Sequence, residues 1–176
     1  MVRARRWTGT ILAGLLFAAG CTVQPLYQSG APDAGVSSTL SSIAVEEVDN
    51  RLALKVRNEL IFLLRGGSAT TMAPLYLATL DVTADTDDLL DTIAMPGEVD
   101  VTARRVTVTG TLTLRRAEDG AVVLEETRRA AASIDVTTQE FANRRALRDA
   151  ENRAARVLAR QLHAVVAARL ASGRTG

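Results

Sequence analysis

The chain has 176 residues with 21 Lys and Arg against 20 Asp and Glu; 47% of the residues are hydrophobic and only 3% are aromatic. This length suits one ordinary domain, and the nearly balanced charge gives no reason to expect a nucleic-acid partner. A single cysteine excludes an internal disulfide framework, so stability must come from packed aliphatic side chains.

The first twenty residues have the layout of a secretory signal peptide. Arg3, Arg5 and Arg6 form a basic start, and residues 7–19 carry no charge. A helix over residues 7–19 would be about 20 Å long, too short to cross about 30 Å of hydrocarbon. These twenty residues hold three of the 21 basic side chains and none of the 20 acidic ones, so their removal leaves 18 against 20 and a net charge of −2.

The end of this segment, Ala18-Ala19-Gly20-Cys21, is similar to a bacterial lipobox, in which the cysteine sulfur receives a diacylglyceryl group and becomes the new N-terminus. Lipoboxes most often carry Leu where this chain has Ala18, and an ordinary signal peptide with a lone cysteine is the alternative. Two or more acyl chains anchor a protein stably. We therefore predict a signal peptide over residues 1–20, a covalent acyl lipid on Cys21, and no other cofactor. Thr22, rather than Asp, permits export to the outer membrane by analogy with enterobacterial sorting.

Residues 21–42 are predicted to be the lipidated N-terminus and a flexible tether, because residues 28–42 are rich in Gly, Pro, Ser and Ala. Residues 43–176 are predicted to form a single domain. It begins with a short strand over residues 43–48. Asp49-Asn50 then supplies a cap for a helix over residues 51–65, which Gly66-Gly67 ends. A wide apolar stripe predicts that this helix packs on a sheet, and it consists of Leu52, Leu54, Val56, Leu60, Ile61, Leu63 and Leu64.

Residues 75–86 alternate between apolar and polar side chains, which predicts a half-buried strand. Asp85, Asp87, Asp88 and Asp91 follow, with Pro96-Gly97 after them. These aspartates lack the spacing and the bidentate Glu of a calcium loop. We predict a solvated acidic loop and no metal site.

Residues 99–116 predict a long strand whose apolar parity changes partway, so a bulge or bend is expected near Arg104-Arg105. Residues 117–120, which end in Asp-Gly, predict a hairpin turn, and a return strand follows over residues 122–136. Thr137 and Glu140 have the spacing of a capping box before a helix over residues 139–171. The predicted order is β-α-β-β-β-α, an α+β fold with a mostly antiparallel four-stranded sheet and two helices on one face.

The sequence offers no nucleophile–base pair. Its only histidine, His163, lies in the last predicted helix, and the chain has no phosphate-binding loop, dinucleotide fingerprint or zinc-ligand spacing. We therefore expect that the protein is not an enzyme. A divergent hydrolase, the alternative, would need a pocket that holds His163 or an acidic pair from the loop of Asp85 to Asp91.

Paired arginines on predicted sheet edges and turns are the remaining candidates for binding. Arg binds phosphate bidentately, and adjacent strand residues face opposite sides, so one arginine of each pair can reach a given surface. An ordinary solvated, salt-bridged face is the alternative. The predicted contacts with a phosphorylated glycolipid or with a partner are Arg104, Arg105, Arg115, Arg116 and Arg128.

Several segments together resemble the LPS-assembly lipoprotein LptE in its alphaproteobacterial form, over nearly the whole chain. They are Cys21 with Pro25-Leu26-Tyr27, Arg57-Asn58-Glu59-Leu60-Ile61-Phe62, Val106-Thr107-Val108-Thr109-Gly110, Gln139-Glu140-Phe141-Ala142 and Arg148-Asp149-Ala150-Glu151-Asn152-Arg153-Ala154-Ala155. The chain departs from the family at Val23 and Gln24, where an aromatic residue or Gly is frequent.

The resemblance implies an outer-membrane lipoprotein that faces the periplasm, anchored through Cys21. It implies that one copy plugs the LPS-transporting β-barrel LptD, assists assembly of that barrel, binds lipopolysaccharide and has no catalytic activity. The family fold, a sheet with two helices, agrees with the predicted order. The alternative is a generic membrane-tethered periplasmic module that recruits another envelope protein.

Overall fold

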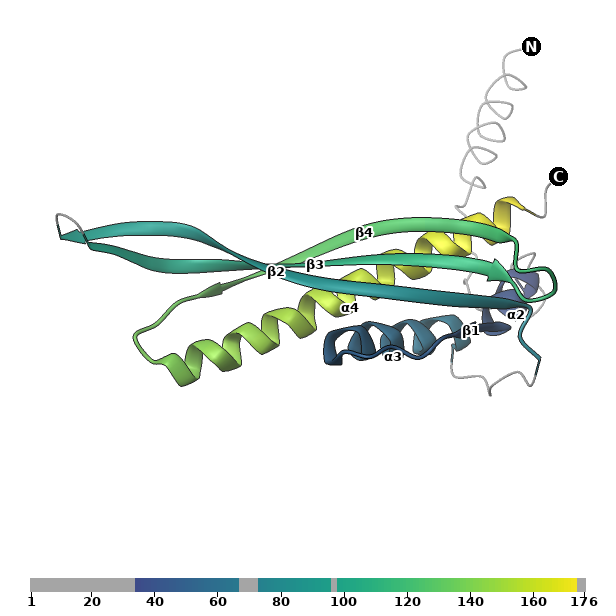
Figure 1. Cartoon of the computed structure of the whole chain (residues 1–176), viewed down its shortest axis with the longest axis horizontal. Coiled ribbons are helices and arrows are strands. Elements are labelled where there is room, and N and C mark those ends of the chain that lie inside the picture. Colours follow the sequence, from purple (N-terminus) through teal and green to yellow (C-terminus); the bar gives the residue numbers. More distant parts are fainter. Residues whose placement is uncertain (1–33, 67–72, 96–97, 174–176) are drawn as a thin grey trace, which may run out of the picture. The chain divides into compact units, whose positions relative to one another are not determined.

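The computed structural model describes residues 34–66, 73–95 and 98–173 (Figure 1). The predicted signal peptide, Cys21 and the first part of the predicted tether lie outside the described residues. The chain divides into two compact units, Met1–Ala34 and Gly35–Gly176, and the second is described below. In chain order the elements are α2 (Ala34–Ser41), β1 (Ile43–Val45), α3 (Arg51–Arg65), β2 (Tyr76–Met95), β3 (Glu98–Arg116), β4 (Val122–Asp135) and α4 (Glu140–Ser172).

The four strands form one sheet in the order β1-β2-β3-β4. β1 runs parallel to β2, and the other neighbouring strands are antiparallel. Helices α3 and α4 lie on the same side of this sheet (Figure 1). The predicted α+β class, with a largely antiparallel four-stranded sheet, is therefore confirmed, and the structure adds helix α2 before the first strand.

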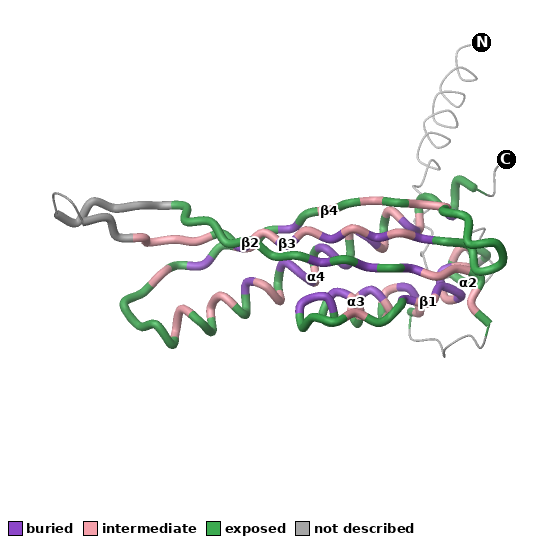
Figure 2. Tube along the Cα trace, viewed as in Figure 1, coloured by how far each residue is buried: buried purple, intermediate pink, exposed green. Residues whose placement is uncertain are grey.

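The core lies between the two long helices and one face of the sheet, as the buried segments in Figure 2 show. Alternate residues of β2 and β3 supply the sheet side of this core, because side chains on a strand alternate between faces. The fully buried positions on β3 are Val106, Val108, Leu112 and Leu114. From β2 the core takes Ala78, Leu80 and Val82.

Helix α3 has the boundaries that its caps predict. The Asn50 side-chain oxygen accepts a hydrogen bond from the Ala53 amide at 2.7 Å, and Gly66 ends the helix with a φ of 54°. Leu60 and Leu64 of the predicted stripe are buried, whereas Leu54 is 43% exposed and lies outside the core. The buried side of α3 is therefore narrower than the sequence predicts.

Helix α4 packs closely because its buried side is lined with small residues. Ala150, Ala154, Ala155 and Ala159 are all fully buried. Opposite them, Gly110 on β3 leaves room for the helix: a Cβ atom there would lie 2.8 Å from Cδ2 of Leu158. The absence of a side chain at Gly110 thus lets α4 approach the sheet at this point.

The start of α4 differs from the predicted capping box. The helix begins at Glu140, and Gln139 occupies the cap position without a side-chain hydrogen bond. Asn143 closes the entry instead: its Oδ1 accepts from the Thr137 amide at 2.8 Å, and its Nδ2 donates to the Thr137 carbonyl at 2.7 Å. The predicted role of Glu140 is wrong because Asn143 already satisfies both backbone groups of Thr137.

Two segments predicted to be irregular are regular. The predicted tether contains α2, and Leu40 of this helix is buried in the core, so the tether prediction is wrong from Ala34 onward. The predicted acidic loop is also wrong, because β2 continues through the aspartates to Met95 and pairs with β3. Partner-strand hydrogen bonds that no local pattern reveals extend this strand.

The expected irregularity on the long strand occurs close to its predicted place. The pairing of β2 with β3 shifts between Asp88 and Leu90 and again between Leu90 and Asp91, opposite residues 101–104. The turn that follows β3 is tight, as predicted, with Gly120 at a φ of 72°. Beyond these shifts β2 and β3 form a two-stranded ribbon, because β4 pairs with β3 only as far as Ala103.

Candidate functional site

No described helix covers the second face of the sheet. We call this surface the open face. On β2 it carries Leu77, Thr79, Asp81, Thr83, Asp85 and Asp87, on β3 it carries Arg105, Thr107, Thr109, Thr111, Thr113 and Arg115, and on β4 it carries Glu125, Thr127, Arg129, Ala131 and Ser133. It is therefore almost entirely polar, although it lies on the opposite side of the same strands that form the core.

Threonine hydroxyls form a continuous row along β3 on the open face. The hydroxyl oxygens of Thr111 and Thr127, on neighbouring strands, lie 2.8 Å apart, and Thr79 donates to a carboxylate oxygen of Glu46 at 3.3 Å. β-branched threonines suit a strand and offer both donors and acceptors. The row makes a rigid surface that can form many hydrogen bonds with a polar partner.

Charges of both signs flank the threonines. The carboxylates of Asp81, Asp85 and Asp87 lie on β2, and exposed Arg105 and Arg129 lie on β3 and β4. Among the described residues, none of these five side chains has an ion-pair partner within 4 Å. The open face is thus a mixed-charge surface whose ionic groups are available to another molecule.

The five arginines predicted as contacts do not gather in one place. Arg105 and Arg115 lie on the open face, ten positions apart on β3, which corresponds to about 33 Å along a strand. The other three have the parity of the helix-covered face. The structure therefore separates them into two faces, as the alternation along a strand requires.

Each of the three arginines on the helix-covered side has a carboxylate partner of its own. Arg104 binds Asp88 at 2.7 Å and Arg116 binds Asp119 at 2.9 Å, whereas Arg128 pairs with Glu126 two residues earlier on the same strand. Surface ion pairs of this kind contribute little to stability. They do offset the positive charge that a phosphate group would need at these three positions.

The predicted contacts include Arg128 but neither its neighbour Arg129 nor the threonine row. The signal was present in the alternation Thr107, Thr109, Thr111 and Thr113, which places four hydroxyls on one side of a single strand. Their importance depends on which face the helices leave uncovered, and that follows from the packing of α3 and α4.

A surface hollow of about 390 Å³ lies where β2 begins and β3 ends. It is lined by Pro74, Leu75, Tyr76, Arg116, Ala117 and Glu118. Leu75 is 59% exposed there, so the hollow combines an apolar wall with a cation and a carboxylate. The hollow is a second candidate contact surface besides the open face, and Arg116 is one of its lining residues.

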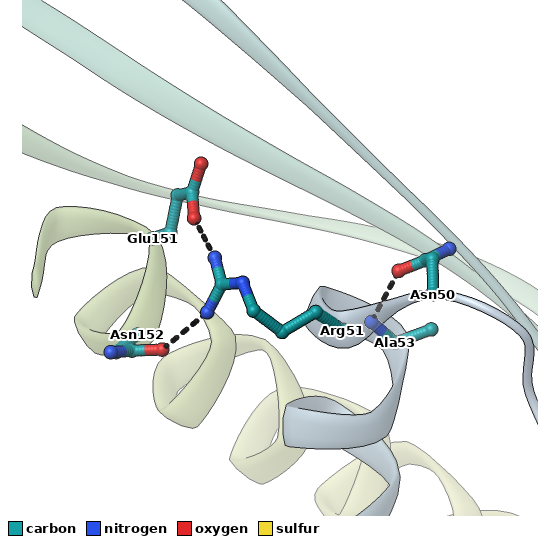
Figure 3. Close-up of polar contacts among 5 residues, drawn as sticks. All are labelled: Asn50, Arg51, Ala53, Glu151 and Asn152. Carbon is teal, nitrogen blue, oxygen red and sulfur yellow. Dashed lines mark hydrogen bonds and ion pairs between the residues drawn. The ribbon is translucent and has the colours of Figure 1, made fainter. Parts of the chain in front are cut away.

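The charged run 148–155 of α4 has a structural role, which Figure 3 shows. Arg51, at the start of α3, forms an ion pair with Glu151 and donates to Oδ1 of Asn152 at 3.3 Å. The alanines of the same run are buried against the core. Through these contacts the segment holds α4 against the start of α3. It lies on the side of the sheet opposite the open face.

His163 is half-buried on α4, and burial lowers its pKa from the ordinary value of 6.5. The side chain is therefore neutral at neutral pH. Among residues 34–66, 73–95 and 98–173, no group of three or more His, Cys, Asp or Glu side chains is arranged to hold a metal ion. Within that part of the chain, no helix is long and apolar enough to cross a membrane.

Comparison with solved structures gives several similar folds. A protein from Caulobacter crescentus CB15, assigned as a lipoprotein, matches with a TM-score of 0.61 and 23% identity, over 78% of this chain and 97% of its own. A minor lipoprotein from Acinetobacter baumannii matches with a TM-score of 0.52 and 14% identity, over 72% of this chain and 88% of its own. The rare lipoprotein B from Shewanella oneidensis matches with a TM-score of 0.50 and 10% identity, over 76% of this chain and 94% of its own.

No family model and no curated protein sequence matches the chain. The solved structures therefore identify its fold as one that bacterial lipoproteins adopt, and the likeness spans nearly the full length of each of the three.

Proposed function

We propose that this protein is an outer-membrane lipoprotein of the LptE type, which plugs the LPS-transport β-barrel, assists its assembly and helps to deliver lipopolysaccharide. The open face is the observation that carries the proposal. A plug has to be rigid and has to present polar groups to the polar lumen of a barrel. A helix-backed sheet with threonines and charges of both signs on its uncovered side meets both requirements.

Membrane attachment rests on two supports. The chain begins with a basic start, an uncharged stretch and the lipobox-like Ala18-Ala19-Gly20-Cys21, and its fold is one found in lipoproteins from three bacteria. Acylation of Cys21 would hold the domain on the periplasmic side of the outer membrane.

The plug role is tested by purifying the tagged protein from detergent-solubilised outer membranes and running the sample on gels with and without boiling. We expect a large partner in equal amount whose migration shifts on heating, as that of a folded β-barrel does. Recovery of the lipoprotein alone would contradict the proposal. It would favour the alternative, a tethered module that recruits another envelope protein.

Contact with lipopolysaccharide is tested separately for the two sides of the sheet. Arg105→Glu alters the open face and Arg116→Glu alters the hollow at the end of β3. We expect one of them, and only one, to weaken binding of purified lipopolysaccharide, with a difference that shrinks as salt is added. Arg160→Glu, on an exposed part of α4, is the matched control because it makes the same change of charge elsewhere. Unchanged binding in both test variants would remove the arginines from the site.

A further inference from the structure

Strand β4 forms one edge of the sheet, and half of its backbone groups face outward. The Val136 amide donates to the Thr102 carbonyl at 2.9 Å, which fixes the hydrogen-bonding phase of the β3–β4 pair. Because bonded and non-bonded pairs alternate along an antiparallel ladder, the even-numbered residues of β4 bond to β3. The N–H and C=O groups of Glu125, Thr127 and Arg129 therefore point away from the sheet.

Two arginines of α4 cover the ends of this edge. Arg169 donates to the Val123 carbonyl at 3.2 Å, and Arg153 donates to the Ser133 carbonyl at 3.0 Å. Both acceptors are odd-numbered, which agrees with the phase given above. Such caps protect an exposed edge against uncontrolled strand addition. Between them lies an uncapped segment, in which the only carbonyl that accepts a hydrogen bond from a side chain among the described residues is that of Thr127, at 3.3 Å from a guanidinium nitrogen of Arg128 on the same strand.

The charges of the uncapped segment change sign about its central residue. The segment runs Glu125-Glu126-Thr127-Arg128-Arg129, with two acidic residues before the central threonine and two basic residues after it. In an antiparallel pair of identical strands centred on Thr127, Glu125 lies opposite Arg129 of the partner subunit, and Glu126 lies opposite Arg128 of the partner subunit. This register pairs odd-numbered residues with odd-numbered residues, as the outward backbone groups require.

We propose that two copies of this chain associate through β4, antiparallel and centred on Thr127, so that their sheets join into one continuous sheet. The exposed side chains of Glu125 and Arg129 have no ion-pair partner among the described residues and lie too far apart on one strand, about 13 Å, to pair with each other. Across the proposed interface both acquire an oppositely charged neighbour.

The same contact lets Glu126 and Arg128 exchange the ion pair that they form within one chain for pairs between chains. Directly opposite charges stabilise a strand pair, and like charges destabilise it. The order of the charges therefore selects this register over one shifted along the strand. An edge protected by charges of one sign would instead repel a second copy.

The backbone contributes about six hydrogen bonds across the interface, two for each of the three outward-facing pairs. Little apolar surface is buried, so we expect a reversible dimer and not an obligate one. The inference does not depend on the proposed function, since it concerns the association of the free protein. In the full-length lipoprotein, attachment to a common membrane would raise the effective concentration of the two copies.

Charge-swap variants of the full chain in mild detergent test the proposal by analytical ultracentrifugation. Arg129→Glu and Glu125→Arg each place like charges opposite one another twice in a homodimer, so we expect each to weaken dimerisation about tenfold. Mixing the two variants restores opposite charges in every pair, and we expect the mixture to dimerise as the unchanged protein does. The double variant Glu125→Arg with Arg129→Glu should also regain dimerisation. Circular dichroism checks that each variant is folded.

Cross-linking tests the register independently. In a Cys21→Ser background, Thr127→Cys places the only two cysteines of a dimer opposite each other, about 5.5 Å apart between Cα atoms, which a disulfide can span. Glu125→Cys places them about 13 Å apart along the strands and is the matched control. We expect oxidation to link the first variant and not the second. A monomer at all concentrations, or equal linking of both variants, would overturn the proposal.

Discussion

Gly110 shows how one missing side chain positions a helix. It lies on β3 between Val82 of β2 and Arg128 of β4, and Leu158 of α4 lies directly over it. Glycine in a strand usually weakens it, because it has no side chain to pack and loses more backbone entropy. Here the closer approach of α4 offsets that weakness, because α4 supplies more buried core residues than the other described helices.

Gly110→Ala should therefore destabilise the protein. The added Cβ would lie 2.8 Å from Cδ2 of Leu158, so the leucine has to move within a packed core. We expect a loss of about 1–3 kcal/mol in the free energy of unfolding, measured by urea denaturation.

A double-mutant cycle provides the control. Leu158→Ala alone should cost about 2–5 kcal/mol by leaving a cavity. In that background we expect Gly110→Ala to cost much less, because the obstructing side chain is gone. Additive effects would show that the glycine is needed for another reason.

His163 predicts a pH dependence of stability. Its pKa is lowered in the folded state by burial, so the folded protein binds a proton at this site less readily than the unfolded chain does. Stability should be fully present above the ordinary pKa of 6.5 and should fall as the pH drops below it. Because the chain has one histidine, NMR titration of its ring protons gives the folded pKa directly. His163→Gln should flatten the stability profile between about pH 5 and 7, and an unchanged profile would contradict the assignment.

The ribbon of β2 and β3 is the element that departs most from the rest of the fold. Before the register shifts, β3 pairs with β4 as well as with β2, and β2 also contacts β1 and α3. Beyond the shifts, β2 and β3 pair with each other and with no other described strand. Isolated two-stranded ribbons are marginally stable in water. The part of β2 after Asp88 should therefore open more readily than the part before it.

Amide hydrogen exchange tests this difference. We expect the amides of Asp91 and Ile93 to exchange much faster than those of Asp81 and Thr83, because the former open locally and the latter only with the core. The β2–β3 pairing itself supplies the internal control, since both segments belong to the same two strands. Equal protection along the whole of β2 would show that another part of the protein supports the ribbon.

The comparison of sequence with structure at this scale separates local signals from distant ones. Apolar periodicity predicts α3 and α4, the caps of α3 predict its bounds, and the Asp-Gly turn predicts the hairpin of β3 and β4, because those signals are contained in the elements themselves. The aspartates of β2 predict a loop because Asp is unusual in strands, and only the pairing with β3 accounts for the strand that forms there. Helix α2 contains five Ser, Thr and Gly residues, which are weak helix formers, and the burial of Leu40 that holds it is a tertiary contact.

The candidate site was predictable in its residue types and not in its assembly. Arginine pairs are visible in the sequence, but their division between two faces requires the register, and the open face requires knowledge of what the helices cover. The change of charge sign about Thr127 in β4 is likewise visible in the amino-acid sequence. It acquires a meaning only when β4 is known to be an edge strand with odd-numbered groups facing outward.

At the scale of the whole molecule, the proposed anchor and the folded domain should be separable. Cys21→Ala removes the atom that would carry the lipid, and Cys21 precedes every element that forms the core. We expect the variant to keep its helical and strand content by circular dichroism and to leave the membrane fraction in cells that lack the proposed barrel partner. Continued membrane association of the variant without any barrel would contradict lipidation at this residue.

The consecutive order of the strands has a consequence for how the chain folds. β2, β3 and β4 pair with their neighbours in sequence, so each of these pairings closes only a short turn. The pairing of β1 with β2 instead closes a longer loop that contains α3. Folding rates rise as contacts become more local. We expect β2, β3 and β4 to pair first as a meander and α4 to pack on them, while β1 pairs with β2 last.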